Sequence, residues 1–200
     1  MTADPGTSVE PGTPDAATTL EVAAPVDLVG TLRPLYRGPA DPTMRLAPRS
    51  VARAAHTPDG PGSLVIDIEG TSAEVRAWGP GAAWLVAGAA AFLGLDDDPS
   101  GFEPGLHEVV ARLARGRSGL RLARTGLVFD ALLPAILEQK ITGSEAFRAY
   151  RRLIVAHGTR VPGPTGLWAP PSAERVASLP SWTWPELGVE PRRGALLRRI

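Results

Sequence analysis

Cationic side chains in the second half of the chain are the residues best placed to do chemistry. Residues 101–200 contain 15 basic and 8 acidic residues, a net charge of +7, whereas residues 1–100 contain 6 basic and 13 acidic residues, a net charge of −7. Arg148, Arg151 and Arg152 would share one face of a helix, because side chains three and four positions apart are neighbours there. A basic surface attracts a polyanion over roughly a Debye length, about 8–10 Å. The pattern favours a nucleic-acid surface, with an ordinary solvated helix face as the alternative.

Several other site chemistries lack the residues that they need. The chain has no cysteine, which excludes a disulfide framework, a thiolate nucleophile and a cysteine-ligated zinc or iron–sulfur site within it. His56, His107 and His157 are far apart in the sequence and show no metal-ligand spacing. No predicted strand is followed by the glycine spacing of a phosphate-binding loop. We therefore expect neither a metal site nor a bound nucleotide.

An antiparallel sheet is predicted to form the first domain, residues 18–97. Residues 1–17 are rich in Pro, Gly, Thr, Ser and Asp without apolar periodicity, and they predict a disordered tail. Apolar and charged residues then partly alternate, as in half-buried strands, within segments bounded by turn residues. We expect strands at Thr18–Ala24, Thr43–Arg53, Gly62–Glu69 and Ser72–Trp78, the second interrupted near Pro48, and flanking helices at Pro25–Leu35 and Ala82–Leu93.

The second domain, residues 98–200, is predicted to be all-α because the hydrophobic period changes from two to about 3.6 after Gly101. Helices are expected at residues 126–139, from the capping box Thr142–Glu145 to Gly158, at Ser172–Ser178, and from Pro191 onward. The predicted buried residues are Phe129, Leu132, Leu133, Ile136 and Leu137 in the first helix, and Phe147, Tyr150, Leu153 and Ile154 in the second. The predicted fold class is α+β, with a small antiparallel sheet domain and flanking helices followed by a helical domain.

The sequence shows no segment that predicts contact with a membrane. The longest apolar run, Ala82–Leu95, has about 14 residues, whereas a helix needs about 20 to cross a bilayer. The acidic, Pro-rich start lacks the basic region of a signal peptide. We expect a cytoplasmic protein.

Part of the second domain resembles a known family. Arg117–Gly158, RSGLRLARTGLVFDALLPAILEQKITGSEAFRAYRRLIVAHG, is similar to the segment of DNA-3-methyladenine glycosylase II in which a PGLRLP-like lead-in precedes two helices joined by a Gly-Gln hairpin. Leu187–Ala195, LGVEPRRGA, looks like that family's step LG-x-x-x-K/R-R-A into the next helix. With the sheet domain upstream, the resemblance covers about residues 18–200. It implies the helix-hairpin-helix DNA glycosylase superfamily.

The resemblance implies a base-excision repair enzyme that removes alkylated purines of the 3-methyladenine type. Such enzymes bend duplex DNA, push the damaged nucleotide out of the stack and hydrolyse its N-glycosidic bond. An alkylated purine is already cationic and leaves readily, so the enzyme mainly stabilises an oxocarbenium-like sugar with an aspartate. No metal or organic cofactor is implied. The implied partner is double-stranded DNA with a damaged base, bound by a monomer in the cytoplasm at the nucleoid.

In that family the catalytic aspartate follows a Gly-rich motif, L-P-G-x-G, which this sequence lacks. Leu179-Pro180-Ser181 matches only the first two positions, and Asp130 lies on the wrong helix to inherit the role. The last predicted helix is still apolar where the sequence stops, at Ala195, Leu196 and Ile200. We therefore expect a front part of a longer glycosylase, with an incomplete helical domain and no catalytic activity by itself.

Carried over by position, Glu138–Thr142 is the loop that probes the base stack, and we call it the probe loop. Gln139 matches the family's glutamine, Lys140 takes the intercalating position, and Glu138 replaces the usual glycine. A short loop between two rigid helices holds one side chain at a fixed protrusion, as such a probe requires. Lysine is charged and flexible, so Lys140 has two alternative roles: contact with a phosphate, or a plain solvated turn. The predicted DNA-binding residues are Gln139, Lys140, Ile141, Thr142, Arg148, Arg151 and Arg152.

Two tryptophans offer a second surface that could contact a base. Trp182 and Trp184 alternate with Ser181 and Thr183, and an indole ring can stack on a nucleobase. Core packing is the commoner use of tryptophans beside a short helix. We expect both to be part of the core.

Two other functions compete with that of a glycosylase. A non-catalytic accessory protein could keep the same front end and use the basic helices to bind duplexes. A small-molecule-binding α+β protein would need a deep apolar pocket and no basic face. Absence of salt-dependent DNA binding would favour the small-molecule binder.

Overall fold

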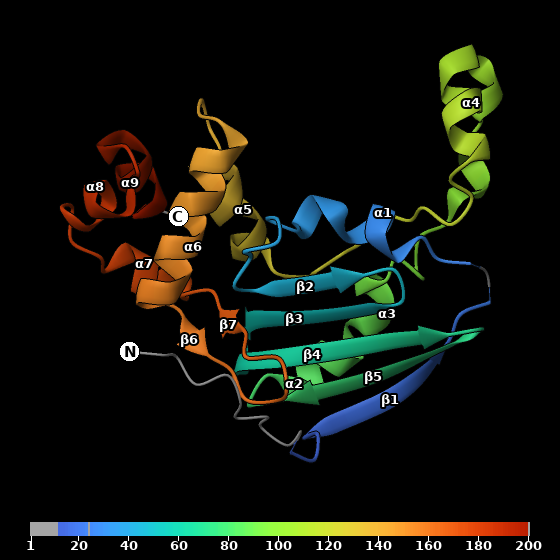
Figure 1. Cartoon of the computed structure of the whole chain (residues 1–200), viewed down its shortest axis with the longest axis horizontal. Helices are drawn as coiled ribbons and strands as arrows, with labels where there is room; N and C mark the ends of the chain where they lie inside the picture. The colour runs from blue at the N-terminus through green and yellow to red at the C-terminus, as the bar shows by residue number, and fades with distance from the viewer. Residues whose placement is uncertain (1–11, 24, 200) are drawn as a thin grey trace, which may run out of the picture.

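The computed structural model describes residues 12–23 and 25–199, and its first half is a five-stranded antiparallel sheet (Figure 1). The strands lie in the order β1-β5-β4-β3-β2 across the sheet. Their bounds are β1 (Ala16–Glu21), β2 (Met44–Ala47), β3 (Ser50–Thr57), β4 (Gly60–Glu69) and β5 (Ser72–Trp78). The predicted antiparallel sheet is confirmed, and the interruption expected near Pro48 is the turn between the paired strands β2 and β3.

The sheet begins earlier in the chain than predicted. β1 starts at Ala16, inside the range predicted as a disordered tail, and pairs along its length with β5. The Asp15 carboxylate accepts a hydrogen bond from the Gly79 N–H at 2.7 Å, and the Gly12 carbonyl accepts one from the Trp78 indole at 2.7 Å. These bonds correct the boundary of the tail, because residues 16 and 17 belong to β1 and the residues just before them are hydrogen-bonded to the end of β5 and the residue after it. The prediction for residues 1–11 lies outside the described part of the chain.

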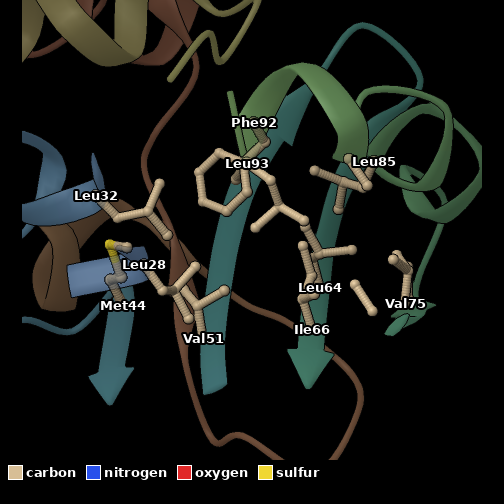
Figure 2. Close-up of a cluster of buried hydrophobic side chains, with 14 of the residues drawn as sticks. Leu28, Leu32, Met44, Val51, Leu64, Ile66, Val75, Leu85, Phe92 and Leu93 are labelled. Atoms are coloured by element: carbon tan, nitrogen blue, oxygen red, sulfur yellow. The ribbon is translucent and has the colours of Figure 1, made fainter. Parts of the chain in front are cut away.

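One face of the sheet carries the hydrophobic core of the first half (Figure 2). Successive side chains of a strand point to opposite faces, so Leu64 and Ile66 of β4 are buried on this face together with Val75 of β5. The helices that cover it are α1 (Leu28–Leu32), α2 (Ala82–Ala87) and α3 (Ala89–Phe92). The first half is therefore a two-layer structure of helices on a sheet.

The covering helices are close to those predicted. Asp27 caps α1 as expected, since its side chain accepts a hydrogen bond from the Gly30 N–H at 2.8 Å, and the 3-10 helix η1 (Arg33–Leu35) completes the predicted segment. The single helix predicted at Ala82–Leu93 is instead two short helices that meet at Gly88. Glycine disfavours a continuous helix because it loses more backbone freedom than other residues.

A segment from the second half returns to the opposite face of the sheet. Residues of β6 (Thr159–Arg160) and β7 (Trp168–Ala169) pair with each other, and the segment packs against β3, where Ala54 forms a buried cluster with Val161, Leu167 and Ala169. The Ser63 hydroxyl of β4 also donates a hydrogen bond to the Pro162 carbonyl at 2.6 Å. The prediction that residues 98–200 are all-α therefore needs correction, because residues 159–169 form a strand pair on the sheet.

The remaining helices pack together around a second core. Their bounds are α5 (Val128–Leu137), α6 (Gly143–His157), α7 (Ala173–Ala177), α8 (Thr183–Leu187) and α9 (Pro191–Leu197). Most of the predicted buried residues lie in this core. Leu132 and Phe147 are exceptions, with side chains 41% and 37% exposed: Leu132 lines an open pocket with Trp84 and Ala91, and Phe147 lies beside the chain at Gly38, so neither enters the second core.

One helix stands apart from both cores. α4 (Glu108–Arg115) follows the 3-10 helices η2 (Pro99–Gly101) and η3 (Pro104–Leu106) and projects away from the sheet (Figure 1). None of its residues is buried, and Val109, Val110 and Leu113 expose apolar side chains. α4 therefore gains little stability from packing on the residues described.

Candidate nucleic-acid interface

The probe loop joins the end of α5 to the start of α6. α5 ends at Leu137, and Thr142 is the N-cap of α6. Gln139, Lys140 and Thr142 are exposed and Ile141 is half-buried, so the structure places these four predicted residues together at one end of the helix pair. Two capped helices leave few residues between them, which keeps the loop short.

Lys140 is distinguished within the loop in two ways. It is the only lysine of the chain, whose other cationic side chains, histidines apart, are all arginines. Its φ is +55°, and it is the only non-glycine residue with a positive φ among residues 12–23 and 25–199. The left-handed conformation costs an L-residue about 1–2 kcal/mol, so the surrounding contacts must compensate for it.

The capping box predicted at Thr142 is confirmed. The Thr142 hydroxyl accepts a hydrogen bond from the Glu145 N–H at 3.4 Å, while a Glu145 carboxylate oxygen accepts from the Thr142 N–H at 3.1 Å and from its hydroxyl at 2.8 Å. The hydrogen bond from the Thr142 hydroxyl has the largest effect on the Glu145 carboxylate, followed by the one from the Thr142 N–H, and both lower the pKa of Glu145. The box fixes the point at which the loop ends and α6 begins.

Thr142→Ala is expected to destabilise the protein by about 1 kcal/mol at neutral pH, because the cap to α6 is lost. The folded protein holds the Glu145 carboxylate at a pKa below its unfolded value. The stability that the ionised Glu145 contributes is fully present at pH values above the pKa of an unfolded glutamate. It is lost as the pH falls through the lowered pKa of the folded protein. Urea unfolding at several pH values should show the penalty shrinking in acid. Thr142→Ser keeps the hydroxyl and is the matched control, and a penalty of equal size in both variants would contradict the assignment.

The three predicted arginines lie on the exposed side of α6. Arg148, Arg151 and Arg152 are all exposed, whereas Tyr150 and Leu153 on the other side are buried. None of the three arginines forms an ion pair within the part of the chain that the structure describes. Arginines without an acidic partner can bind phosphate groups without first breaking a salt bridge.

Asp130 forms an ion pair that the sequence did not reveal. Its carboxylate lies 3.2 Å from a guanidinium nitrogen of Arg53 on β3, and the two side chains are only 10% and 11% exposed. Burial raises the pKa of Asp130, and the Arg53 charge opposes this change. The Arg53 guanidinium also lies over the Phe92 ring, 5.1 Å from its centroid. The pair borders a cavity of about 220 Å³ between the sheet and α5.

The two tryptophans have different environments. Trp184 is 1% exposed and lies at the centre of the second core, as predicted, whereas Trp182 is 69% exposed. The expectation that both rings are core residues is therefore wrong for Trp182. It precedes α8, whose buried residues are Thr183, Trp184 and Leu187, and its own indole ring is exposed to solvent.

No metal site is present among the described residues, since no three His, Asp or Glu side chains there could hold an ion together. His56 lies on β3, His107 precedes α4 and His157 ends α6, so the structure keeps them in separate elements. Across the described ranges, no helix has the length and apolar character needed to span a membrane.

Solved structures identify the fold. Over 91% of its residues the chain superposes on 3-methyladenine DNA-glycosylase from Archaeoglobus fulgidus, with a TM-score of 0.76 and 18% sequence identity. The chain shares its fold with DNA glycosylases. MBOgg1, solved with a low-affinity DNA ligand, matches with a TM-score of 0.70, 13% identity and coverage of 94% of this chain and 62% of that one. Clostridium acetobutylicum 8-oxoguanine glycosylase/lyase in its apo form matches with a TM-score of 0.55, 11% identity and coverage of 78% and 64%.

The likeness to DNA glycosylases is one of structure at low sequence identity. No protein-family model matches the sequence, and no curated protein matches it. The chain spans 65% of the length of the Archaeoglobus enzyme. The expected DNA glycosylase fold is therefore confirmed over the shared part, and the type of lesion stays a prediction.

Proposed function

We propose that this chain is the DNA-binding part of a base-excision repair glycosylase that removes alkylated purines of the 3-methyladenine type. The observation that carries the proposal is the exposed probe loop with Lys140 in a left-handed conformation, on a fold shared with DNA glycosylases. The choice of alkylated purines is supported by the motifs in Arg117–Gly158 and by the 3-methyladenine glycosylase among the structural neighbours. The proposed partner is double-stranded DNA with a damaged base, bound by a monomer in the cytoplasm at the nucleoid.

The proposed contacts follow from the chemistry of the exposed side chains. The four methylene groups of Lys140 can fill the space left by a flipped base, while the ammonium group reaches a phosphate or a base edge. Gln139, Ile141 and Thr142 flank it in the loop. Arg148, Arg151 and Arg152 on α6 would bind phosphates and release counterions. A base leaves the stack more readily when it is damaged, because its stacking and pairing are weaker.

Cleavage of the N-glycosidic bond needs a carboxylate that faces the sugar of the flipped nucleotide. Asp130 is engaged with Arg53 and nearly buried, so it does not fit this role. We propose that no carboxylate of the described residues does, and that the 200-residue chain binds and unstacks DNA without hydrolysing the bond.

Lys140→Ala is expected to reduce unstacking about tenfold or more while changing affinity less than about threefold, because phosphate contacts supply most of the affinity. The probe is a duplex with 2-aminopurine beside 1,N6-ethenoadenine, in which fluorescence reports unstacking and anisotropy reports binding. Arg115→Ala on α4 is the control, since it removes one exposed positive charge outside the proposed interface.

The salt dependence of binding tests the proposed surface. Replacing one of the α6 arginines by alanine should lower the slope of log K against log[salt] by about one. Absence of salt-dependent binding would overturn the proposal and favour a small-molecule binder. Binding in which unstacking is absent, or does not depend on Lys140, would favour the non-catalytic accessory protein.

A further inference from the structure

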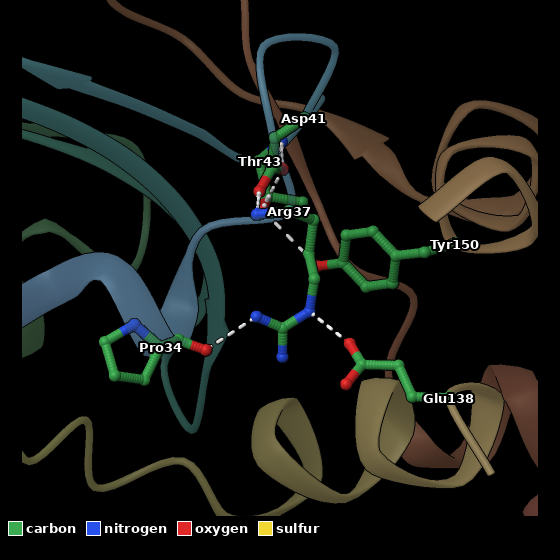
Figure 3. Close-up of polar contacts among 6 residues, drawn as sticks. All are labelled: Pro34, Arg37, Asp41, Thr43, Glu138 and Tyr150. Atoms are coloured by element: carbon green, nitrogen blue, oxygen red, sulfur yellow. Dashed lines mark hydrogen bonds and ion pairs between the residues drawn. The ribbon is translucent and has the colours of Figure 1, made fainter. Parts of the chain in front are cut away.

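A chain of polar contacts joins the segment before β2 to Glu138 of the probe loop and to α6, the helix that follows the loop (Figure 3). Arg37, in the segment after η1, places its Nε 2.8 Å from an Oε1 of Glu138, the first residue of the loop. The same guanidinium donates a hydrogen bond to the Pro34 carbonyl at 2.7 Å, and the Arg37 N–H donates to the Asp41 carboxylate at 2.8 Å. Contacts within its own segment therefore orient Arg37 independently of its ion pair with Glu138.

The Asp41 carboxylate also links this segment to α6, the helix after the loop. Asp41 is 1% exposed, and its other oxygen accepts hydrogen bonds from the N–H and the hydroxyl of Thr43, at 2.8 and 2.7 Å. The Thr43 hydroxyl lies 3.3 Å from the hydroxyl of Tyr150 on α6. Burial, and then the Asp41 charge, raise the pKa of Tyr150, so its phenol stays protonated near neutral pH. The contacts thus run from Glu138 through the sheet domain to α6.

We propose that Arg37 is a positioning residue for the probe loop, acting through its ion pair with Glu138. This inference rests on the proposed function for its consequence on DNA, although the loop can be tested without DNA. Glu138 lies two residues before Lys140. Its side chain is 40% exposed, whereas that of Arg37 is 13% exposed, so Arg37 is the more firmly held partner of the pair. Arg193 of α9 adds a second restraint on the loop side, since its guanidinium donates to the Leu137 carbonyl at 2.7 Å.

The ion pair depends on Glu138, at a position where the resembling family has glycine. The ion pair needs a carboxylate that extends from the end of α5 toward the sheet, which glycine does not provide. The ion pair also opposes rotation of the loop about the end of α5. Such a rotation would change the direction in which the Lys140 side chain protrudes. Segments with few buried contacts open locally while the rest of the protein stays folded. We expect loss of this partly buried ion pair to make such openings of the probe loop more frequent.

Endoproteinase Lys-C tests the link without DNA, because the chain has one lysine and would be cut at one bond, Lys140–Ile141. Arg37→Met should raise the rate of this cleavage of the folded chain about three- to tenfold, and Glu138→Gln should do the same. The double variant should be no faster than either single variant, because both remove one interaction. Arg37→Lys keeps the charge and should restore most of the protection. Arg49→Met is the control, because Arg49 is an exposed arginine in the turn between β2 and β3 and its side chain makes no hydrogen bond or ion pair with the described residues.

With DNA, Arg37→Met should lower 2-aminopurine unstacking about three- to tenfold and leave the salt slope of binding unchanged. Unchanged cleavage in Arg37→Met, or single-variant effects that add in the double variant, would overturn the positioning role. Faster cleavage with unchanged unstacking would also overturn it, if the unsubstituted chain unstacks DNA. If that chain neither binds nor unstacks DNA, the proposed function fails, whereas the cleavage rates still decide whether Arg37 restrains the loop.

Discussion

Asp130→Ala is expected to lower the free energy of unfolding by about 3–5 kcal/mol, because it leaves the Arg53 guanidinium nearly buried without its anionic partner. The cation–π contact with Phe92 remains but is worth only about 1–2 kcal/mol. Urea unfolding followed by circular dichroism measures the change. A loss below about 1 kcal/mol would show that water or a rearranged side chain solvates Arg53 in the variant.

The double replacement Arg53→Met with Asp130→Leu is the matched control. It removes both charges and keeps the volume, so we expect its stability to lie within about 2 kcal/mol of the original protein. The raised pKa of Asp130 adds a pH dependence with a defined sign. The folded protein binds this proton more tightly than the unfolded chain, so the stability from this group is present below the unfolded pKa and lost as the pH rises through the folded pKa. The original protein should therefore lose stability relative to the double variant over that range.

Trp184→Ala is expected to cost about 3–5 kcal/mol, because a fully buried indole leaves a cavity among the helices of the second core. The ring is closely packed: a Cβ added to Gly194 of α9 would lie 2.3 Å from the Trp184 Cγ. The helices that α8 contacts, α6 and α9, cannot collapse fully into the space. The same unfolding experiment measures the loss.

Trp182→Ala is the control, since it deletes the same side chain two residues away at a site that is 69% exposed. Its effect should stay within about 0.5 kcal/mol. Trp184→Phe should lie between the two variants, because the Trp184 indole N–H has no hydrogen-bond partner among the described residues and phenylalanine keeps most of the apolar contact. Equal losses in the two alanine variants would contradict the assignment of Trp184 to the core.

Much of the local structure followed from the sequence because its signals are local. The capping box at Thr142 and the N-cap Asp27 depend on residues three positions apart, and both are present. The predicted strand at Ser72–Trp78 has the predicted bounds, since alternation over a whole strand is a strong pattern.

Long-range pairing could not be predicted in this way. Asp130 and Arg53 are 77 positions apart, and Arg37 and Glu138 are 101 apart, so no periodicity connects them. The strand pair at residues 159–169 was missed because two-residue strands carry no alternation, and it is held in place by contacts with Ala54. The probe loop was located by resemblance, and no spacing in the sequence indicated the left-handed conformation of Lys140.

The return of residues 159–169 to the sheet has a consequence for folding. Because residues 159–169 pack on the sheet, separating the chain into two parts near residue 97 would expose the face of the sheet around Ala54. The two cores should therefore melt in one cooperative transition, with coincident curves from different spectroscopic probes. Folding should also be slow for a chain of this size, because the strand pair contacts a sheet formed from residues about one hundred positions earlier.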